Sequence, residues 1–167
     1  MHTKGSHNRV YGTIVLSSKG RILIVQGRET GKWSFPKGHK NKNAEPALDC
    51  ALRETWEETG LTLGKDYLEI LQLAAGKYFV YKVDDELSLE THDSNEIMDM
   101  RWTELNNLEN FNNNCDVRSY IMRGHMLRHK SELALSKKME LQGVIENLIE
   151  RFDAVSIKKM ETIPLIM

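Results

Sequence analysis

Three glutamates, Glu54, Glu57 and Glu58, are the residues whose types and spacing most clearly indicate chemistry. At about 100° per residue of an α-helix, their side chains fall within an arc of roughly 100°. Carboxylates this close repel one another unless a cation lies between them. Mg²⁺ suits such a position, because it prefers carboxylate oxygens and shares its remaining positions with substrate phosphates. The spacing therefore predicts a metal site that acts on a phosphorylated substrate.

The helix that must position these acids is predicted from about residue 44 to residue 59. Pro46 is tolerated in the first turn of a helix, and Gly60 is typical of a helix end. The opposite side of the helix is expected to pack on the core through Leu48, Ala51, Leu52 and Thr55. The prediction is therefore a helix that is buried on one face and acidic on the other.

The segment R-E-T-W-E-E-T-G-L at residues 53–61 resembles the core of the Nudix motif, G-x5-E-x7-R-E-U-x-E-E-x-G-U, where U is a bulky apolar residue. Glu45 also stands at the motif's distance from Arg53, with seven residues between them. The sequence departs from the motif twice, because six residues rather than five separate Gly38 from Glu45, and Thr55 replaces an apolar residue. The extra residue predicts a longer loop before the helix.

The Nudix resemblance implies an α/β/α sandwich with a mixed central sheet, here followed by extra C-terminal helices. It implies hydrolysis of a diphosphate linkage with Mg²⁺ or Mn²⁺ as cofactor. The metal ligands carried over are Glu54, Glu57, Glu58 and the backbone carbonyl of Gly38, and one of the three acids is a candidate base. Arg53 is expected to pair with Glu45 and to hold the loop against the helix.

Nudix enzymes often use a further acid from a loop before a late strand. In H-D-S-N-E-I-M-D-M-R-W, we favour Glu96 as the distant metal ligand or general base, with Asp93 and Asp99 as rivals. The alternative for Glu96 is a solvated loop acid. The catalytic prediction is therefore Glu57, Glu96 and Arg53, with the base left open among Glu96 and the three helix acids.

The rest of the chain is predicted to supply a sheet first and helices later. Strands are expected at residues 10–16, 22–26, 33–35, 67–75, 77–83 and 97–102, and helix at 116–152 with an interruption near 130–136. The corresponding domain prediction is a flexible segment at 1–8, a Nudix hydrolase domain at 9–155 and a tail at 156–167.

Composition is that of one globular domain, with 167 residues of which 40% are hydrophobic and 28% charged. No apolar run approaches a membrane span, and the first residues lack the apolar core of a signal peptide. Cys50 and Cys115 have no metal-type spacing, and Cys50 is expected to be a buried free thiol. These features predict a cytoplasmic protein without a membrane partner; the oligomeric state is left open.

Charge is unevenly distributed along the chain. Residues 1–43 carry nine Lys or Arg and one acid, whereas residues 44–110 carry sixteen acids and five Lys or Arg. A basic region beside an acidic, metal-binding region suits a polyphosphate ligand. The alternative is a surface on which charges segregate without a ligand.

The segments W-S-F-P-K-G at 33–38 and L-D-C-A-L-R-E at 48–54 look like those of mRNA-decapping Nudix enzymes, including those of large DNA viruses. This resemblance implies capped RNA as substrate, with Lys37, Lys40 and Lys42 as phosphate contacts. Trp33 is a candidate for stacking on the cap base, although a core role is the alternative. Arg118, His125 and His129 are expected on one helical face, which either follows an RNA backbone or is merely solvated.

Other functions remain open from the sequence. P-K-G-H at 36–39 with A-L-R-E-T at 51–55 also resembles diadenosine tetraphosphate hydrolases, and the basic loop would suit diphosphoinositol polyphosphates. A nucleotide pyrophosphohydrolase is a further alternative. A non-catalytic Nudix module that binds RNA or nucleotides is disfavoured, because such a module has no chemical need for Arg53 and all three acids.

Overall fold

A computed structural model describes residues 9–161, with side-chain surroundings described as far as residue 155. The predicted N-terminal segment at 1–8 and residues 162–167 of the predicted tail lie outside the described residues. The elements are β1 (Val10–Ser17), β2 (Arg21–Gly27), β3 (Trp33–Ser34), β4 (Lys37–Gly38), α1 (Ala47–Thr59), β5 (Glu69–Gln72), β6 (Gly76–Val83), β7 (Ile97–Glu104), the 3₁₀ helix η1 (Leu105–Asn110), α2 (Cys115–Met122) and α3 (His125–Glu161).

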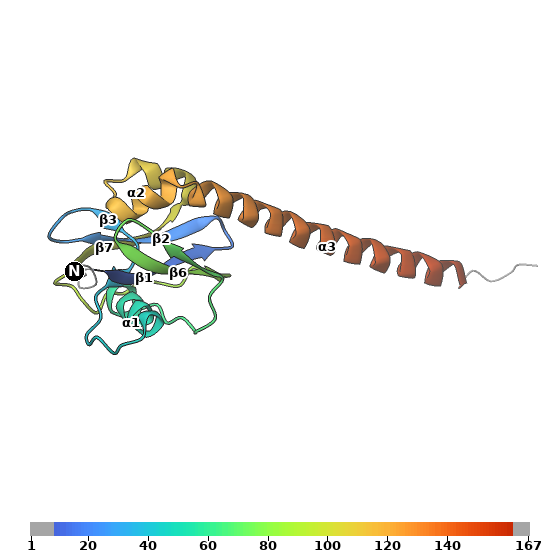
Figure 1. Ribbon diagram of the computed structural model, residues 1–167. Helices are drawn as coiled ribbons and strands as arrows, with labels where there is room; N and C mark the ends of the chain where they lie inside the picture. The colour runs from blue at the N-terminus through green and yellow to red at the C-terminus, as the bar shows by residue number, and fades with distance from the viewer. Residues whose placement is uncertain (1–8, 162–167) are drawn as a thin grey trace, which may run out of the picture. The chain divides into compact units, whose positions relative to one another are not determined.

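The described strands form one mixed sheet in the order β3-β2-β1-β6-β5, with β4 also paired to β1 and β7 also paired to β2. Strands β1 and β6 are parallel, whereas β2 is antiparallel to β1 and to β7. Helix α1 covers one face of the sheet and α2 the other (Figure 1). The predicted α/β/α sandwich with a mixed sheet is therefore confirmed.

Apolar side chains fill both faces of the sheet. Under α1, the cluster consists of Val15, Leu23, Ala51, Leu61, Phe79 and Tyr81. On the α2 side, the Phe35 ring meets Tyr78 and Tyr120 edge to face, at centroid distances of 5.6 and 5.3 Å. Such contacts anchor both helices on the sheet, so the side chains that α1 and α2 carry are held in place.

Helix boundaries differ from the predictions at the start of α1, at the break between α2 and α3, and at the end of α3, which lies at Glu161 rather than at residue 152. Helix α1 begins at Ala47 rather than near residue 44, because Pro46 has an extended backbone, with ψ 143°, and serves as the N-cap. The late helical segment does not break near 130–136, so that prediction is wrong. It breaks at Gly124, whose φ of 77° lies in the left-handed region, and α3 then runs from His125 to Glu161.

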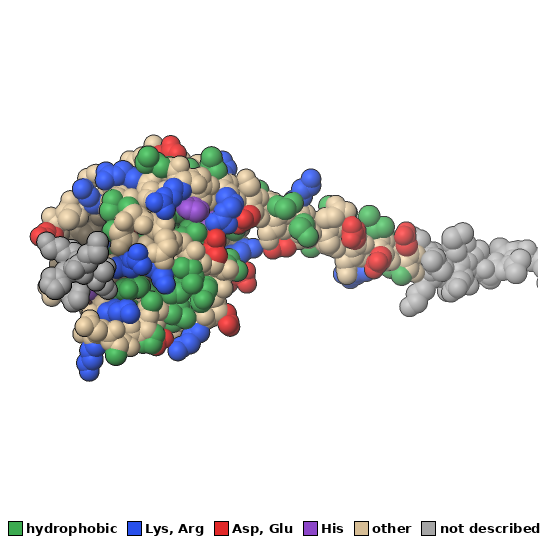
Figure 2. Space-filling model, viewed as in Figure 1, with side chains coloured by type: hydrophobic (Ala, Val, Ile, Leu, Met, Phe, Trp, Pro, Cys, Tyr) green, Lys and Arg blue, Asp and Glu red, His purple; other side chains and the backbone are tan. Residues whose placement is uncertain are grey.

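The chain forms two compact units, one ending at Lys130 and the other beginning at Ser131. In the second unit, taken by itself, most apolar side chains of α3 are at the surface (Figure 2). Phe152 is 72% exposed, and several of the other apolar side chains are more than half exposed. Within residues 9–161, no helix combines the length and the apolar character that crossing a membrane requires.

Candidate active site

Two glycines allow the short strand β4 to lie against both β1 and α1. A Cβ at Gly12 of β1 would collide with the carbonyl oxygen of Pro36, and a Cβ at Gly38 would collide with the carboxyl group of Glu54. Strand β4 pairs with β1 at Gly12 and Tyr11, so it is held beside the helix that packs on β1. Gly38 therefore lies beside the carboxyl group of Glu54. That its carbonyl ligates a metal stays a prediction.

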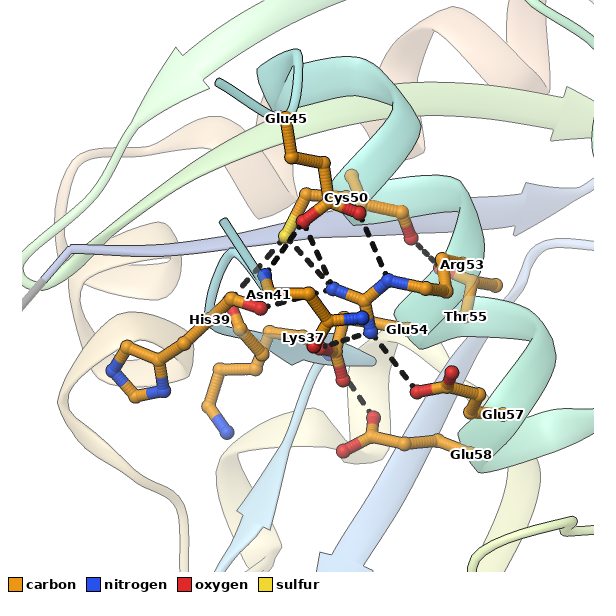
Figure 3. Close-up of polar contacts among 12 residues, drawn as sticks. Lys37, His39, Asn41, Glu45, Cys50, Arg53, Glu54, Thr55, Glu57 and Glu58 are labelled. Atoms are coloured by element: carbon orange, nitrogen blue, oxygen red, sulfur yellow. Dashed lines mark hydrogen bonds and ion pairs between the residues drawn. The ribbon is translucent and has the colours of Figure 1, made fainter. Parts of the chain in front are cut away.

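Arg53 lies at the centre of the site, where its guanidinium contacts three carboxylates (Figure 3). Its Nε and Nη2 donate to the two oxygens of Glu45, at 2.9 and 3.1 Å. Its Nη1 donates to Glu54 at 2.8 Å and to Glu57 at 3.1 Å. Nη2 also donates to the His39 carbonyl at 2.9 Å, which ties the loop to the helix. The predicted Arg53–Glu45 pair is confirmed, and it holds the pKa of Glu45 below its ordinary value.

Glu58 is buried, with 5% of its surface exposed, although the sequence predicted a solvent-facing acidic side of the helix. Strand β4 covers it, and the backbone N–H of Lys37 donates to its Oε2 at 3.0 Å. Burial, with added repulsion from Glu54 and Glu96, raises the pKa of Glu58 to about 8. Burial also raises the pKa of Glu54, against the opposing effect of Arg53. The cluster thus holds more negative charge than its burial favours.

The carboxylate and carbonyl oxygens gathered here are the types of ligand that a hard divalent cation prefers. Carboxylate oxygens of Glu54, Glu57 and Glu58 lie along one helix, and the Gly38 backbone touches Glu54. However, no group of three or more His, Cys, Asp or Glu side chains among the described residues is arranged to hold a metal ion. Arg53 explains this arrangement, because its guanidinium holds Glu54 and Glu57. A cation would therefore share these carboxylates with Arg53, which contacts one oxygen of Glu54 and one of Glu57.

Of the three acids considered outside the helix, Glu96 has the freest carboxylate. Asp93 Oδ1 accepts the Glu96 backbone N–H at 3.1 Å, and Asp99 forms an ion pair with Arg101. Glu96 is exposed, and its carboxylate has no hydrogen-bond or ion-pair partner in the part of the chain that the structure describes. Its charge nevertheless contributes to the raised pKa of Glu54 and Glu58, so it lies within electrostatic reach of them.

The predicted substrate residues divide into accessible and buried ones. Lys37, Lys40 and Lys42 lie on β4 and the loop that follows it, and the Lys40 ammonium is 5.0 Å from the Tyr11 ring centroid. Trp33, in contrast, is only 7% exposed; its ring meets Phe111 edge to face at 5.2 Å, and the Arg101 guanidinium lies over it at 4.6 Å. This packing favours the core alternative for Trp33.

The predicted face of Arg118, His125 and His129 is wrong, because Arg118 belongs to α2 and the two histidines to α3. His129 is also buried, with 1% exposure, and its ring nitrogens contact the Tyr120 hydroxyl and Glu69, each at 2.7 Å. His129 therefore anchors the start of α3 and is not accessible to an RNA backbone.

Sequence reasoning missed two polar contacts under α1. The hydroxyls of Thr13 and Thr55 lie 2.7 Å apart, and Thr55 also donates to the Ala51 carbonyl at 2.7 Å. Thr55 thus replaces the motif's apolar residue with a buried hydrogen bond. The Cys50 thiol lies 3.9 Å from the Gly38 carbonyl, and burial raises its pKa to about 12, so it is a buried free thiol as predicted. The signal for the first contact was the departure at Thr55 itself.

Comparison with known proteins agrees with this geometry. A family profile described as NUDIX domain matches residues 6–123. The chain belongs to the Nudix family. The Nudix motif therefore coincides with the Arg53 network, and the acids that the motif specifies are those that the fold gathers beside Gly38.

Several curated proteins are similar to this Nudix chain. The mRNA-decapping enzyme subunit 2 of Arabidopsis thaliana is 33% identical over 108 residues, which cover 60% of this chain and 29% of that protein. The m7GpppN-mRNA hydrolase of Saccharomyces cerevisiae is 28% identical over 127 residues, or 68% of this chain and 13% of that protein. The chain thus spans less than a third of the length of these relatives.

Solved structures share the fold at lower identity. An Ap4A hydrolase from C. elegans has a TM-score of 0.56 at 24% identity, covering 77% of this chain and 99% of that chain. A MutT protein from Methanosarcina mazei Go1 has a TM-score of 0.58 at 20% identity, covering 77% and 98%. These similarities support the fold alone.

Proposed function

We propose that the protein is a Nudix hydrolase that uses Mg²⁺ or Mn²⁺ to cleave the diphosphate linkage in the 5′ cap of mRNA. The observation that carries the proposal is the acidic cluster itself, in which Glu54 and buried Glu58 share a site with Arg53 against the Gly38 backbone. A structural helix face has no need for such concentrated charge. The decapping relatives favour capped RNA over other Nudix substrates.

In the proposed site, Glu54, Glu57, Glu58 and the Gly38 carbonyl hold the cation. A bound divalent cation would offset negative charge on the substrate phosphates and make water a better nucleophile. Arg53 keeps Glu54 and Glu57 in position through Nη1 and keeps the β4–α1 loop against the helix through Glu45 and the His39 carbonyl. Arg53 is therefore proposed to contribute to catalysis by positioning the acids and the loop.

Glu96 is the proposed proton acceptor for the attacking water, with Glu57 the other acid assigned to catalysis. Glu96 is exposed, and its carboxylate has no hydrogen-bond or ion-pair partner among the described residues, so a water molecule can reach it and give up a proton to it. Glu57 is partly exposed, with 36% of its side chain accessible, whereas Glu58 is covered by β4. A base must be reachable by the water that it activates, which favours these two acids over Glu58.

The substrate phosphates are proposed to lie along Lys37, Lys40 and Lys42. These side chains follow one another on β4 and the loop, beside the acids, so their charge would offset the phosphates that the carboxylates repel. Trp33 is not kept as a contact for the cap base, because its ring is buried and packs against Phe111 and the Arg101 guanidinium.

Mass analysis of products from a substrate panel tests the proposal. The protein would be mixed with capped RNA, diadenosine polyphosphates, nucleoside triphosphates and diphosphoinositol polyphosphates, each with Mg²⁺, with Mn²⁺ or with a chelator. We expect a methylguanosine phosphate and a 5′-phosphorylated RNA from capped RNA, and no product with the chelator. Release from a small molecule but not from RNA would overturn the decapping assignment. Release from none would favour a non-catalytic binding module.

A further inference from the structure

A cavity of about 320 Å³ lies between the end of η1 and α2. It is lined by Glu109, Phe111, Asn112, Asn113, Arg118, Ile121 and Met122. Two backbone hydrogen bonds of 2.9 Å connect this segment to β3, from Trp33 to the Asn112 carbonyl and from Asn114 to the Trp33 carbonyl. Trp33 precedes Lys37 by four residues, a span of at most about 14 Å. The cavity therefore adjoins the segment that leads into β4, the strand that carries Lys37.

One wall of the cavity is apolar and includes an aromatic ring. Phe111 supplies this ring, whose orientation is fixed by the edge-to-face contact with Trp33 at 5.2 Å. The Arg101 guanidinium lies 4.6 Å from the Trp33 centroid and 6.0 Å from that of Phe111, so it packs against both rings. Ile121 and Met122 complete the apolar part. Such a wall suits a flat, partly apolar ligand.

The two charged side chains of the lining form no contacts that stabilise the described part of the fold. Arg118 and Glu109 are exposed, and neither side chain has an ion-pair or hydrogen-bond partner among the described residues. Asn113 donates from Nδ2 to the Leu108 carbonyl at 2.7 Å, but its buried Oδ1 has no hydrogen-bond partner in the described part of the chain. The cavity thus offers the Arg118 guanidinium and the Glu109 carboxylate to a ligand, whereas the Asn113 oxygen is buried beneath it.

These groups together select against a phosphate as the occupant. The positive charge of Arg118 and the negative charge of Glu109 offset each other, and the carboxylate would repel an anion. A nucleobase matches the accessible lining, because it is planar, its ring nitrogens and carbonyls accept from Arg118, and its N–H groups donate to the Glu109 carboxylate. We propose that this cavity binds one base of the RNA substrate, outside the bond that is cleaved. This inference rests on the proposed function, since it assumes RNA as the ligand.

The test compares an uncapped oligoribonucleotide with an abasic chain of the same length, each labelled for fluorescence anisotropy. The measured quantity is the ratio of the two Kd values, abasic over RNA, in the wild type and in Arg118→Ala, Glu109→Lys and Lys130→Ala. Arg118→Ala and Glu109→Lys change the charge in opposite directions at exposed positions. Lys130→Ala is the matched control, because Lys130 is an exposed base outside the cavity. Circular dichroism would verify that each variant is folded.

We expect the ratio to fall on the order of 10-fold in both Arg118→Ala and Glu109→Lys, as for the loss of one base contact, and to stay unchanged in Lys130→Ala. If Arg118 contacts a phosphate instead, Arg118→Ala will weaken the binding of RNA and of the abasic chain equally, and the slope of log Kd against log salt will drop by about 1. In that case Glu109→Lys will strengthen the binding of both. That result, or an unchanged ratio in both variants, would overturn the inference.

Anisotropy requires no turnover, so the two proposals fail separately. A protein that distinguishes RNA from the abasic chain through Arg118 and Glu109 but does not hydrolyse caps would sink the decapping assignment and leave the base-binding cavity standing. A protein that hydrolyses capped RNA with the same ratio in wild type and in both variants would retain its function and lose the cavity as a base site.

Discussion

Glu58 on the α1 side of the sheet and Asp116 on the α2 side are both buried acids, but the fold supplies them with different partners. Asp116 is 1% exposed, and its two oxygens accept from the Ala75 backbone N–H and the Tyr78 hydroxyl, both at 2.6 Å. Glu58 is 5% exposed and accepts one backbone N–H, from Lys37. Glu58 also lies in a cluster of acids, whereas Asp116 is surrounded by neutral donors.

The difference indicates what each acid is for. Hydrogen bonds that match both oxygens make a buried carboxylate a stabilising part of the core. On the α2 side, Glu69 is also supplied with donors: burial acts to raise its pKa, but His129 and Arg128, which both contact its Oε1, outweigh burial and lower the pKa. On the α1 side, burial prevails and the pKa of Glu58 rises. An acid left with too few partners is destabilising unless a cation joins it, so the α1 cluster is expected to act in binding and catalysis.

The largest expected effect is on turnover by Glu57→Gln and Glu58→Gln. Each change keeps the side-chain volume and removes one charge from the proposed metal site, so we expect kcat to fall by about 10²–10³-fold with the fold intact. Steady-state rates on capped RNA measure this, with Glu29→Gln as the control, because Glu29 is an exposed acid between β2 and β3. Wild-type kcat in both variants would remove the metal-site assignment.

The converse is expected for Asp116→Asn. An amide cannot accept from both the Ala75 N–H and the Tyr78 hydroxyl without turning its NH₂ group toward a donor, so we expect the free energy of unfolding to fall by about 2 kcal/mol. Because Asp116 lies away from the acidic cluster, kcat below the melting temperature should stay within about twofold of the wild type. Urea denaturation and initial rates measure the two quantities. A loss of kcat at unchanged stability would contradict the comparison.

The parts of this contrast that sequence could predict are the local ones. The Arg53–Glu45 pair is predicted by the motif resemblance, which lies within one loop and one helix, and the structure places Gly38 of that motif beside Glu54. The burial of Glu58 does not follow from the sequence, because helical periodicity gives a side chain's direction and not what covers it. Its cover is β4, which is placed there by pairing with β1 from an earlier part of the chain.

The late helices show the same limit. A polar segment near 130–136 was expected to end a helix, but Ser and Glu carry only a small helix penalty and α3 continues through them. The break occurs at Gly124, the residue type that best tolerates a positive φ. His129 looked like an exposed basic residue, yet its partners Tyr120 and Glu69 lie in other elements, so only tertiary structure could reveal its burial.

A smaller effect is expected from Thr13→Val, which tests whether the α1 side also contains purely structural polar contacts. Removing this hydroxyl leaves Thr55 with its Ala51 partner but without Thr13, so we expect a loss of about 1 kcal/mol in the free energy of unfolding. The double variant Thr13→Val with Thr55→Val should recover part of that loss, since both partners become apolar. Denaturation of the three proteins measures this, and kcat should not change. A single variant as stable as the wild type would show that the threonine pair is neutral.

The smallest expected effect is the pH dependence of stability without metal. The pKa of Glu58 is about 8 in the folded protein and near 4.5 in the unfolded chain, so between these values the folded state keeps a proton that the unfolded state releases. This stabilising contribution is complete below pH 4.5, declines as the pH rises and is gone above about 8. In chelator, Glu58→Gln should therefore reduce the drop in Tm between pH 5.5 and 8 by several degrees relative to the wild type. Added Mg²⁺ or Mn²⁺ should raise the wild-type Tm most at pH 8, where the carboxylate is ionised and attracts a cation. Identical pH profiles for the wild type and Glu58→Gln would mean that Glu58 is no less well matched than Asp116, and the contrast between the two sides of the sheet would fail.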